Sequence, residues 1–335
     1  MTSTTSSATP RRLKTWSIAG ETRRKPSEYE IVTGKFHYHF NRKPAPFDLD
    51  PNAPINQWYL KYREGSALQA PDWEGFRDPA ALNYRRYIAL QHDREVYAEG
   101  VVDRYESQDL DTGLGQAWVK TLARLYTPAR YLFHVLQLSS LYVGQLAPSA
   151  YITNAAYFQA ADELRALQWV GYRSKSLSLT HGTHLANTEA TRQIWEDDPV
   201  WQPARVALEK LLIAYDWGES FVALNLVLKP ALDALYKEVF AQLAIDHGDQ
   251  LTAALLQESN VDTVRNQDWH VALARYALSA NPDNRAVVVG WIDKWRPLAD
   301  RAVEGLANAF PEPAGATAQV AASVAAFTGK WRADG

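Results

Sequence analysis

The segment from Tyr131 to Leu146 constrains the fold more than any other part of the chain. Its large apolar residues fall on nearly every side of a helix: Tyr131, Leu132, Val135, Leu136, Leu138, Leu141, Tyr142 and Leu146. A helix that is apolar around most of its circumference has to be buried among other elements. The segment therefore predicts the central helix of a helical protein.

Helical spacing recurs along most of the chain. We expect a helix that starts at Asp78-Pro79, a long element over 116–147 with a break at Thr127-Pro128, and a helix from Pro148-Ser149 to about Ser178. Later helices are predicted at 189–196, 204–228 (bent or stopped at Pro230), 236–244, 261–278 and 284–310. Strand signals are nearly absent outside Ile31 to Phe40, which could pair as a short strand. The sequence predicts an all-α bundle of long helices.

Both ends of the chain differ from this body. Residues 1–60 are polar, rich in proline and dotted with aromatic residues, which predicts an extended arm across the helical body or across another chain. Residues 311–335 are rich in proline, alanine and glycine, and we expect a loose tail with at most a marginal helix. The predicted organisation is an arm (1–60), a helical domain (61–310) and a tail (311–335).

Composition excludes several classes of protein. The 335 residues can bury a substantial core, and the net charge of −3 gives no drive toward nucleic acid or anionic membranes. The absence of cysteine excludes disulfides and thiolate ligands. We find no apolar run of about 18 residues and no secretory signal in residues 1–12. We expect a cytoplasmic protein. Its 12 tryptophans predict a large aromatic core, or anchors at a protein interface.

The most informative motif is Asp-Glu-Leu-Arg-Ala over residues 162–166. Di-iron proteins of the four-helix type use Glu-x-x-His, because residues three apart share a helix face and both side chains can reach one metal pair. Glu163 is present, but the residue three positions later is Ala166, which cannot bind a metal. The motif looks like a metal site that lacks its ligand.

Other candidate ligands do not complete a site. Glu219 is followed three positions later by Val222, and His134 stands alone on its helix. If Glu163, Glu219 and His134 are buried, we expect arginine, tyrosine or each other to hold them rather than a metal. The histidine pairs, His37 with His39 and His181 with His184, also lack carboxylate or thiol partners nearby in sequence. Glycine-rich phosphate loops and serine nucleophile motifs are absent.

Segments spread over about residues 13–310 resemble one known family. They are Thr15-Trp-Ser17, Arg24-Lys-Pro-Ser-Glu-Tyr29, Trp58-Tyr59, Lys61-Tyr-Arg63, Thr127 to His134, Asp216-Trp-Gly-Glu219 with Leu224-Asn-Leu226, Asn281-Pro-Asp-Asn284, Gly290-Trp-Ile292 and Lys294 to Arg301. This set resembles the beta subunit of the hydroxylase component of bacterial multicomponent soluble di-iron monooxygenases. The similarity is to the toluene, alkene and isoprene monooxygenase group.

The resemblance implies a ferritin-like fold and a role without an active site. In that family the alpha subunit carries the di-iron centre in an Asp-Glu-Leu-Arg-His type of motif, and the beta subunit has no metal. Ala166 fits a beta subunit. The resemblance therefore implies no catalytic, cofactor-binding or metal-binding residue in this chain.

The resemblance also implies partners. The assembly would be a dimer of αβγ units that receives electrons from NADH through a reductase and a Rieske ferredoxin, with a small effector protein. It would insert one oxygen atom of O₂ into a hydrocarbon, with arene, alkene and isoprene substrates all open. The arm and the tryptophans would pack against the alpha subunit.

Two alternatives stay open on the sequence. One is a self-contained ferritin-like oxidase with an irregular metal site built from Glu163, Glu219 and His134. The other is an interaction module unrelated to oxygen chemistry.

Overall fold

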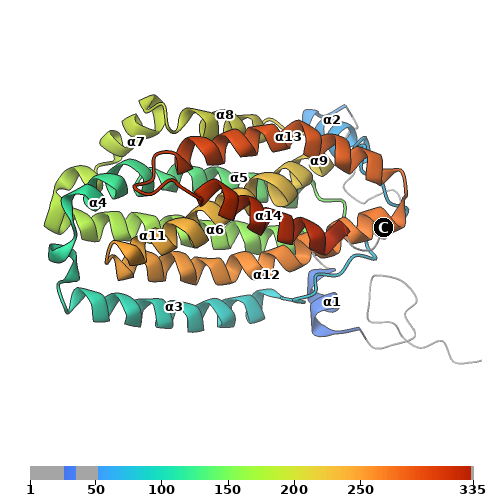
Figure 1. Ribbon diagram of the computed structural model, residues 1–335. Coiled ribbons are helices and arrows are strands. Elements are labelled where there is room, and N and C mark those ends of the chain that lie inside the picture. Colours follow the sequence, from blue (N-terminus) through green and yellow to red (C-terminus); the bar gives the residue numbers. More distant parts are fainter. Residues whose placement is uncertain (1–25, 35–51, 333–335) are drawn as a thin grey trace, which may run out of the picture.

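The computed structural model describes residues 26–34 and 52–332, and the regular secondary structure of these ranges is entirely helical (Figure 1). The all-α prediction is confirmed. The α-helices are α1 Glu28–Thr33, α2 Pro54–Tyr59, α3 Tyr84–Glu106, α4 Gln116–Thr121, α5 Ala129–Leu146, α6 Ala150–His181, α7 Thr188–Asp197, α8 Gln202–Leu211, α9 Trp217–Phe221, α10 Lys229–Asp233, α11 Ala241–Asp246, α12 Gln250–Ala280, α13 Asn284–Ala307 and α14 Ala316–Arg332.

Shorter helical segments join several of these. π-Helical segments span Leu60–Glu64, Leu122–Tyr126, Val222–Leu228 and Ala234–Phe240, and 3₁₀ turns span Leu110–Gly113 and Thr183–Leu185. None of the described helices has the length and apolar character needed to cross a membrane.

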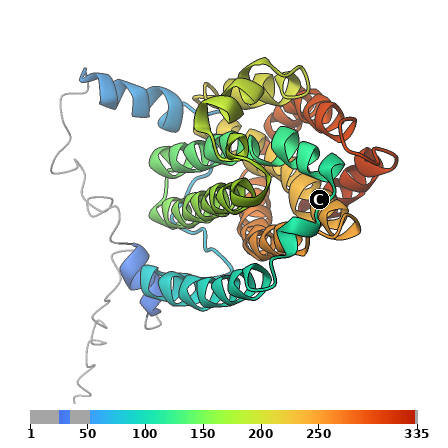
Figure 2. The ribbon, with the colours of Figure 1, turned by 90° about the vertical axis from the view of Figure 1, so that its left-hand side faces the viewer.

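Helices α5 and α6 form a closely packed pair at one edge of the bundle (Figure 2). The predicted break at Thr127-Pro128 separates α5 from the preceding helix. The predicted restart at Ser149 is the N-cap of α6, where the serine hydroxyl accepts a hydrogen bond from the N–H of Tyr151. The prediction that the Tyr131–Leu146 segment is the central helix is therefore wrong: most of its residues pack into the core, but the helix lies at an edge of the bundle and one side of it faces outward.

A rod of helix from Trp217 to Asp246 runs through the centre of the bundle, made of α9, α10, α11 and the π-helical segments between them. Every residue from Ser220 to Lys237 is buried. The prediction that the helix stops at Pro230 is wrong, because the helix continues through it. The π-helical segment Val222–Leu228 lies directly before this proline, where a wider turn relieves the clash of its ring.

Two other predicted helix boundaries are also wrong. The predicted helix over 204–228 is interrupted at 212–216, where Asp216 caps α9 by accepting the N–H groups of Gly218 (2.8 Å) and Glu219 (3.1 Å). The helix expected at Asp78-Pro79 begins at Tyr84, with Asn83 as its N-cap. At both sites the helix begins directly after a capping residue, Asp216 or Asn83, whose side chain accepts hydrogen bonds from the first backbone N–H groups of the helix.

Two described segments near the ends of the chain are helical where the sequence predicts an extended arm and a loose tail. Residues 28–33 are helical rather than extended, because Ser27 and Glu30 form a reciprocal capping box. Residues 35–40 of the expected strand, with His37 and His39, lie outside the described residues. In place of a loose tail, α14 packs against α10 and α12 and buries Val320, Phe327 and Trp331. These apolar residues share one helix face.

The tryptophans mostly fill the chain's own core. Eight are buried within it: Trp118, Trp169, Trp195, Trp201, Trp217, Trp269, Trp295 and Trp331. Trp58 in the predicted arm is partly buried and donates a hydrogen bond to the hydroxyl of Tyr142 (3.1 Å). The eight buried tryptophans confirm the large aromatic core, and their burial leaves them no role as interface anchors; for Trp58 such a role stays a prediction.

Candidate functional site

Glu163, the carboxylate of the incomplete metal motif, lies at the centre of the bundle and is 1% exposed. One oxygen of its carboxylate accepts a hydrogen bond from the ammonium group of Lys229, which is equally buried, on α10. Ala166, one turn further along α6, borders a narrow apolar space lined by residues such as Phe133 and Leu255. The position where a histidine ligand would stand is therefore surrounded by apolar side chains, and a lysine holds the carboxylate.

Lys229 belongs to a charge-balanced cluster that we call the central lysine cluster: Glu163, Lys229, Asp233 and Lys237. The Lys229 ammonium lies 2.7 Å from Oδ2 of Asp233, and the Lys237 ammonium lies 2.8 Å from Oδ1 of the same residue. Lys237 also donates to the hydroxyl of Thr263 (2.8 Å). Two cations thus face two carboxylates in a region without solvent, where an unpaired charge would be costly.

The shifted pKa values reflect this pairing. Burial alone would lower the pKa of Lys229, but Asp233 and Glu163 outweigh it and raise that pKa above its usual value. Burial would likewise raise the pKa of Asp233, but the ammonium groups of Lys229 and Lys237 lower it. Lys229 and Asp233 are therefore both held in their charged forms.

His270 on α12 lies beside the cluster and is neutral. Burial, and then the nearby Lys229 cation, lower its pKa well below the usual value. Its Nε2 contacts Oε1 of Gln159, whose amide donates to Asn225 Oδ1 (2.8 Å) and Ser140 Oγ (2.9 Å). The bundle centre thus holds one histidine bound to an amide.

This arrangement does not fit a di-iron centre. Such a centre needs several free carboxylates and two histidines converging from four helices. Here lysine ammonium groups already neutralise the central carboxylates, and the residues in ranges 26–34 and 52–332 contain no group of three or more His, Asp or Glu side chains placed to hold a metal ion.

The structure does not bring the other predicted site residues together with Glu163. Glu219 on α9 accepts hydrogen bonds from the ammonium of Lys294 (2.6 Å) and the indole N–H of Trp295 (2.8 Å). His134 is exposed on α5, and its Nδ1 lies 3.0 Å from Oε1 of its neighbour Gln137. Protein groups hold Glu163 and Glu219, as expected, although the partners are lysine and tryptophan rather than arginine, tyrosine or each other, and the irregular metal site finds no support.

The remaining histidine pair is also divided. His181 ends α6 and its Nε2 lies 2.8 Å from the backbone carbonyl of Asp111. His184 is exposed in the 3₁₀ turn that follows.

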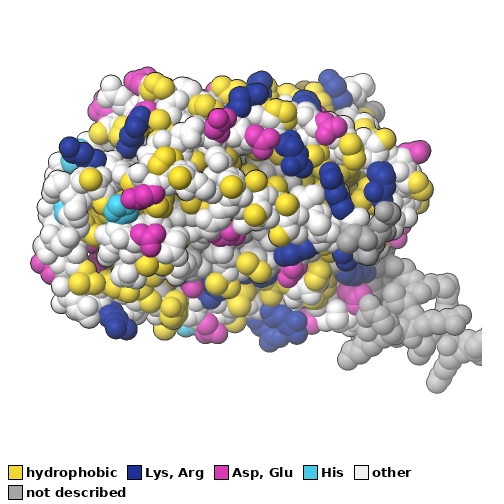
Figure 3. All heavy atoms as spheres, in the orientation of Figure 1, with side chains coloured by type: hydrophobic (Ala, Val, Ile, Leu, Met, Phe, Trp, Pro, Cys, Tyr) yellow, Lys and Arg dark blue, Asp and Glu magenta, His cyan; other side chains and the backbone are white. Residues whose placement is uncertain are grey.

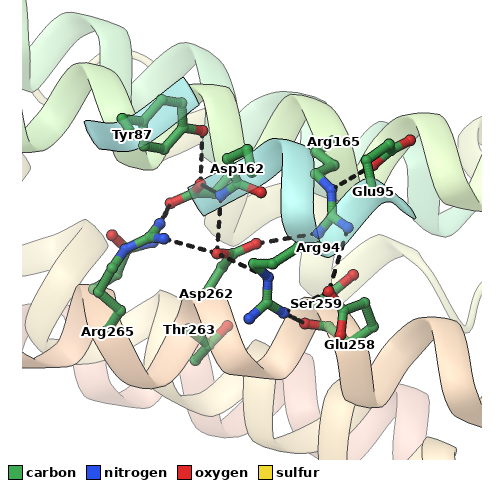
Figure 4. A network of polar contacts seen from close by, with 12 residues as sticks. Tyr87, Arg94, Glu95, Asp162, Arg165, Glu258, Ser259, Asp262, Thr263 and Arg265 are labelled. Atoms are coloured by element: carbon green, nitrogen blue, oxygen red, sulfur yellow. Dashed lines mark hydrogen bonds and ion pairs between the residues drawn. The ribbon is translucent and has the colours of Figure 1, made fainter. Parts of the chain in front are cut away.

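Asp162, the residue before Glu163, points to a different side of α6, into the seam with α3 and α12 (Figure 4). Its carboxylate accepts hydrogen bonds from the hydroxyl of Tyr87 (2.8 Å) and the amides of Gln91 (2.9 Å) and Asn266 (2.9 Å), and from the guanidinium of Arg265. Burial, and then the neighbouring Asp262 carboxylate, raise the pKa of Asp162 to about 6.

Three arginines extend this seam network. Arg165 on α6 pairs with Glu95 of α3 (2.9 Å) and with Asp262 of α12 (3.3 Å). Arg94 on α3 lies 2.7 Å from Glu258 on α12, and Arg265 lies 2.9 Å from Asp262. The network ties α3 to the bundle, and two of its members, Glu95 and Arg165, also line a hollow of about 550 Å³ between α3 and α6. We infer a structural role for it.

Lys229, Asp233 and Lys237 were missed by the sequence interpretation. A signal was available: they recur every four residues inside a segment that is otherwise almost wholly apolar, Phe221 to Phe240. Charged residues one turn apart on one helix face, in a stretch that must be buried, predict an internal ion-pair ladder.

One hollow of about 720 Å³ lies between α13 and α14, with Arg296, Asp300 and Val324 among its lining residues. It is bordered by α13, α14 and the outer side of the central rod, and none of the central lysine cluster lines it. It gives no access to the residues of the incomplete motif.

Comparison with known proteins identifies the family. The family model described as methane/phenol/alkene hydroxylase matches residues 58–281. The chain is 44% identical over 293 residues to the hydroxylase component subunit beta of the toluene-4-monooxygenase system of Ectopseudomonas mendocina, covering 87% of this chain and 89% of the relative. It is 27% identical to an oxygenase component of phenol 2-monooxygenase of Pseudomonas sp. strain CF600, with 72% of each chain covered.

The fold agrees with a solved structure. A chain in the structure of toluene 4-monooxygenase with toluene bound in its resting active site superimposes with a TM-score of 0.81 at 40% identity, covering 94% of this chain and 99% of that one. This confirms the ferritin-like helical architecture implied by the sequence resemblance. The chain belongs to the methane/phenol/alkene hydroxylase family and is a homologue of its toluene-4-monooxygenase hydroxylase beta subunit.

Proposed function

We propose that this chain is the non-catalytic beta subunit of a multicomponent monooxygenase hydroxylase. The observation that carries the proposal is the Lys229 ammonium on the Glu163 carboxylate, together with Ala166 in place of a histidine ligand. The beta subunit relative, at 44% identity, supports the same role. The di-iron centre, which activates O₂ for insertion of one oxygen atom into a hydrocarbon, then belongs to a larger partner subunit.

The chain's own residues supply a rigid support. The central lysine cluster keeps the bundle centre charge-balanced and free of metal, and the seam network ties α3 to α6 and α12. Both are built from charged groups on different helices, so they fix the register of those helices. A fixed register gives the partner a surface of constant shape.

The wider system is part of the proposal. We include a dimer of αβγ units, an effector protein, and electron supply from NADH through a reductase and a Rieske ferredoxin, in the cytoplasm. The similarity to a toluene-4-monooxygenase component favours a toluene-like arene as substrate over an alkene or isoprene. The substrate pocket would lie in the partner.

The native mass of the complex tests this function. The full chain, tagged at its C-terminus, is purified from its own host and measured by native mass spectrometry with metal analysis. We expect a heteromer with a larger, iron-bearing subunit and a small third chain. A monomer or a homo-oligomer contradicts the proposal.

The arm offers a second test. Tyr29 and Trp58 pack on the chain's own body, so deletion of residues 1–60 would remove internal contacts as well as any contacts with a partner. Deletion of residues 1–25 leaves both in place. We expect this shorter deletion to impair assembly while the helix content, measured by circular dichroism, stays unchanged. Normal assembly of the truncated chain contradicts an interface role for those residues.

A further inference from the structure

The outward faces of α5 and α6 carry no charged residue over most of their length. The exposed positions of α5, and those of α6 as far as Tyr172, are spaced by three, four or seven residues, so they form one stripe on each helix. We call them together the α5–α6 face: His134, Leu138, Leu141, Gln145, Tyr157, Leu164, Gln168 and Tyr172.

The two stripes lie on the same side of the molecule. α5 and α6 run side by side at the edge of the bundle opposite α14 (Figure 2). A Cβ atom on Gly144 of α5 would come within 2.5 Å of the ring of Tyr157, so this tyrosine lies directly over the α5 backbone. The stripe of α6 therefore continues onto α5 without a gap.

Other exposed helices of the same protein are highly charged. The exposed charged residues of α13 are Arg285, Asp293, Lys294, Arg296, Asp300, Arg301 and Glu304. Basic and acidic side chains are scattered over the side of the molecule formed by α12, α13 and α14 (Figure 3). The exposed side of α13 is thus rich in charged side chains. The core of a protein interface, by contrast, is depleted of charge and enriched in aromatic residues.

We infer that the α5–α6 face is the docking surface for the larger subunit of the hydroxylase. This inference rests on the proposed function and names the surface through which it acts. Two helices about 10 Å apart with a stripe about 22 Å long present on the order of 450 Å², more than half of the about 800 Å² per partner in a standard interface. The face is large enough to be the core of a stable contact.

One edge of the face indicates the chemistry of the partner. Gln168 and Tyr172 border a hollow of about 550 Å³ whose opposite wall, on α3, carries Glu95, Glu99 and Asp103; Arg165 of α6 also lines it and pairs with Glu95 (2.9 Å), so three carboxylates face one cation there. A second copy of the α5–α6 face brings no lysine or arginine to this acidic edge. The partner surface is therefore an uncharged, apolar helical surface flanked by lysine or arginine on the α3 side.

The test compares matched charge substitutions. Leu138→Glu with Leu164→Glu places two carboxylates on the face, at positions that are each 39% exposed. Val289→Glu, on α13 and 40% exposed, is the control. We expect the double variant to bind the larger subunit about 100-fold more weakly or worse, because a buried unpaired charge is costly, and the control to bind like the unaltered chain. Circular dichroism melting confirms that each isolated variant is folded.

A second measurement uses the absence of cysteine from the chain. Leu164→Cys introduces a single thiol, and its rate of alkylation is compared in the isolated chain and in the complex, with Val289→Cys as the control. We expect both cysteine variants to be labelled fast in the isolated chain. In the complex, we expect slow labelling of Leu164→Cys and unchanged, fast labelling of Val289→Cys. Protection of Leu164→Cys in the isolated chain, by its own residues or by a second copy, overturns the inference.

The remaining outcomes separate this inference from the proposed function. If the unaltered chain binds the larger subunit and the double variant binds equally well, the docking surface is elsewhere and the proposed function stands. The same conclusion follows if the control weakens binding as much as the double variant. If the unaltered chain does not bind the larger subunit, both the inference and the proposed function fail.

Discussion

Asp162 and Glu163 are consecutive residues of α6 whose carboxylates enter two different kinds of buried ionic contact. Asp162 points into the seam between α6, α3 and α12, where tyrosine, amide and guanidinium groups share it and its pKa is raised to about 6. Glu163 points into the bundle centre, where its contact is the ammonium of Lys229. The two sites differ in how many partners each charge has.

The difference follows from the cations. An arginine presents several N–H groups in a plane and can serve two carboxylates at once, as Arg165 does with Glu95 and Asp262. A lysine ammonium is a compact charge, and in the centre Lys229 is shared only between Glu163 and Asp233. The seam is therefore redundant, whereas the centre depends on each member. The lysines also supply the positive charge that metal ions would bring to a ferritin-like site.

Loss of Lys229 should have the largest effect. Lys229→Met leaves Glu163 buried without a cation and Asp233 with Lys237 alone, and we expect a loss of about 3–5 kcal/mol in the free energy of unfolding. Urea denaturation followed by circular dichroism measures it. The double variant Lys229→Met with Glu163→Gln removes both charges and should lose clearly less. An equal loss in both variants would show that lost packing, rather than an unpaired charge, causes the effect.

Loss of an arginine in the seam should cost less. Arg265→Met leaves Asp162 with Tyr87, Gln91 and Asn266, and leaves Asp262 with Arg165. We expect a loss of about 1–3 kcal/mol in the same denaturation experiment. A loss as large as that of Lys229→Met would contradict the redundancy of the seam.

The pH dependence of stability distinguishes the two sites by sign. The pKa of Asp162 is raised from 3.8 to about 6, so the folded chain binds this proton more tightly and stability falls as the pH rises through that window. The pKa of Asp233 is lowered from 3.8. Its contribution to the free energy of unfolding is therefore present above pH 3.8 and is lost only at lower pH. Asp162→Asn should therefore flatten the curve of unfolding free energy against pH between about 4 and 6.

Asp233→Asn is the control for this slope. It should lower stability at every pH in that window and leave the slope unchanged. A slope that persists in Asp162→Asn, or disappears in Asp233→Asn, would reverse the assignment of the two carboxylates.

The smallest effect is expected at His134. Its side chain is exposed and contacts Gln137 of the same helix. His134→Ala should change the free energy of unfolding by no more than about 0.5 kcal/mol. A larger loss would indicate that His134 takes part in a site that the contacts do not reveal.

Local patterns predicted much of the fold. The apolar circumference of residues 131–146, the break at Thr127-Pro128 and the capping serine at 149 act over a few residues, so the sequence shows them directly. The break at 212–216 was missed because the apolar spacing continues across it, while the cap at Asp216 depends partly on a hydrogen bond from Ser66 (2.6 Å), far away in sequence. Helix α14 was underestimated because its stability comes from packing against α10 and α12.

The sequence shows the residues of the candidate site but not the contact between them. Ala166 alone showed that Glu163 lacks its histidine partner, and the ladder of Lys229, Asp233 and Lys237 was visible as charges one turn apart in an apolar segment. That Lys229 reaches Glu163, 66 residues away, is a tertiary contact that spacing does not reveal. The choice between a vacant metal site and an ion pair therefore needed the structure.

Iron binding by the isolated full-length chain tests the central claim most directly. The purified chain is titrated anaerobically with Fe(II), desalted and analysed for metal, in parallel with Glu163→Gln. Because ammonium groups already neutralise the central carboxylates, we predict no retained iron above background in either protein. Stoichiometric iron in the unaltered chain that is lost in Glu163→Gln would contradict this account and would make the bundle centre a metal site.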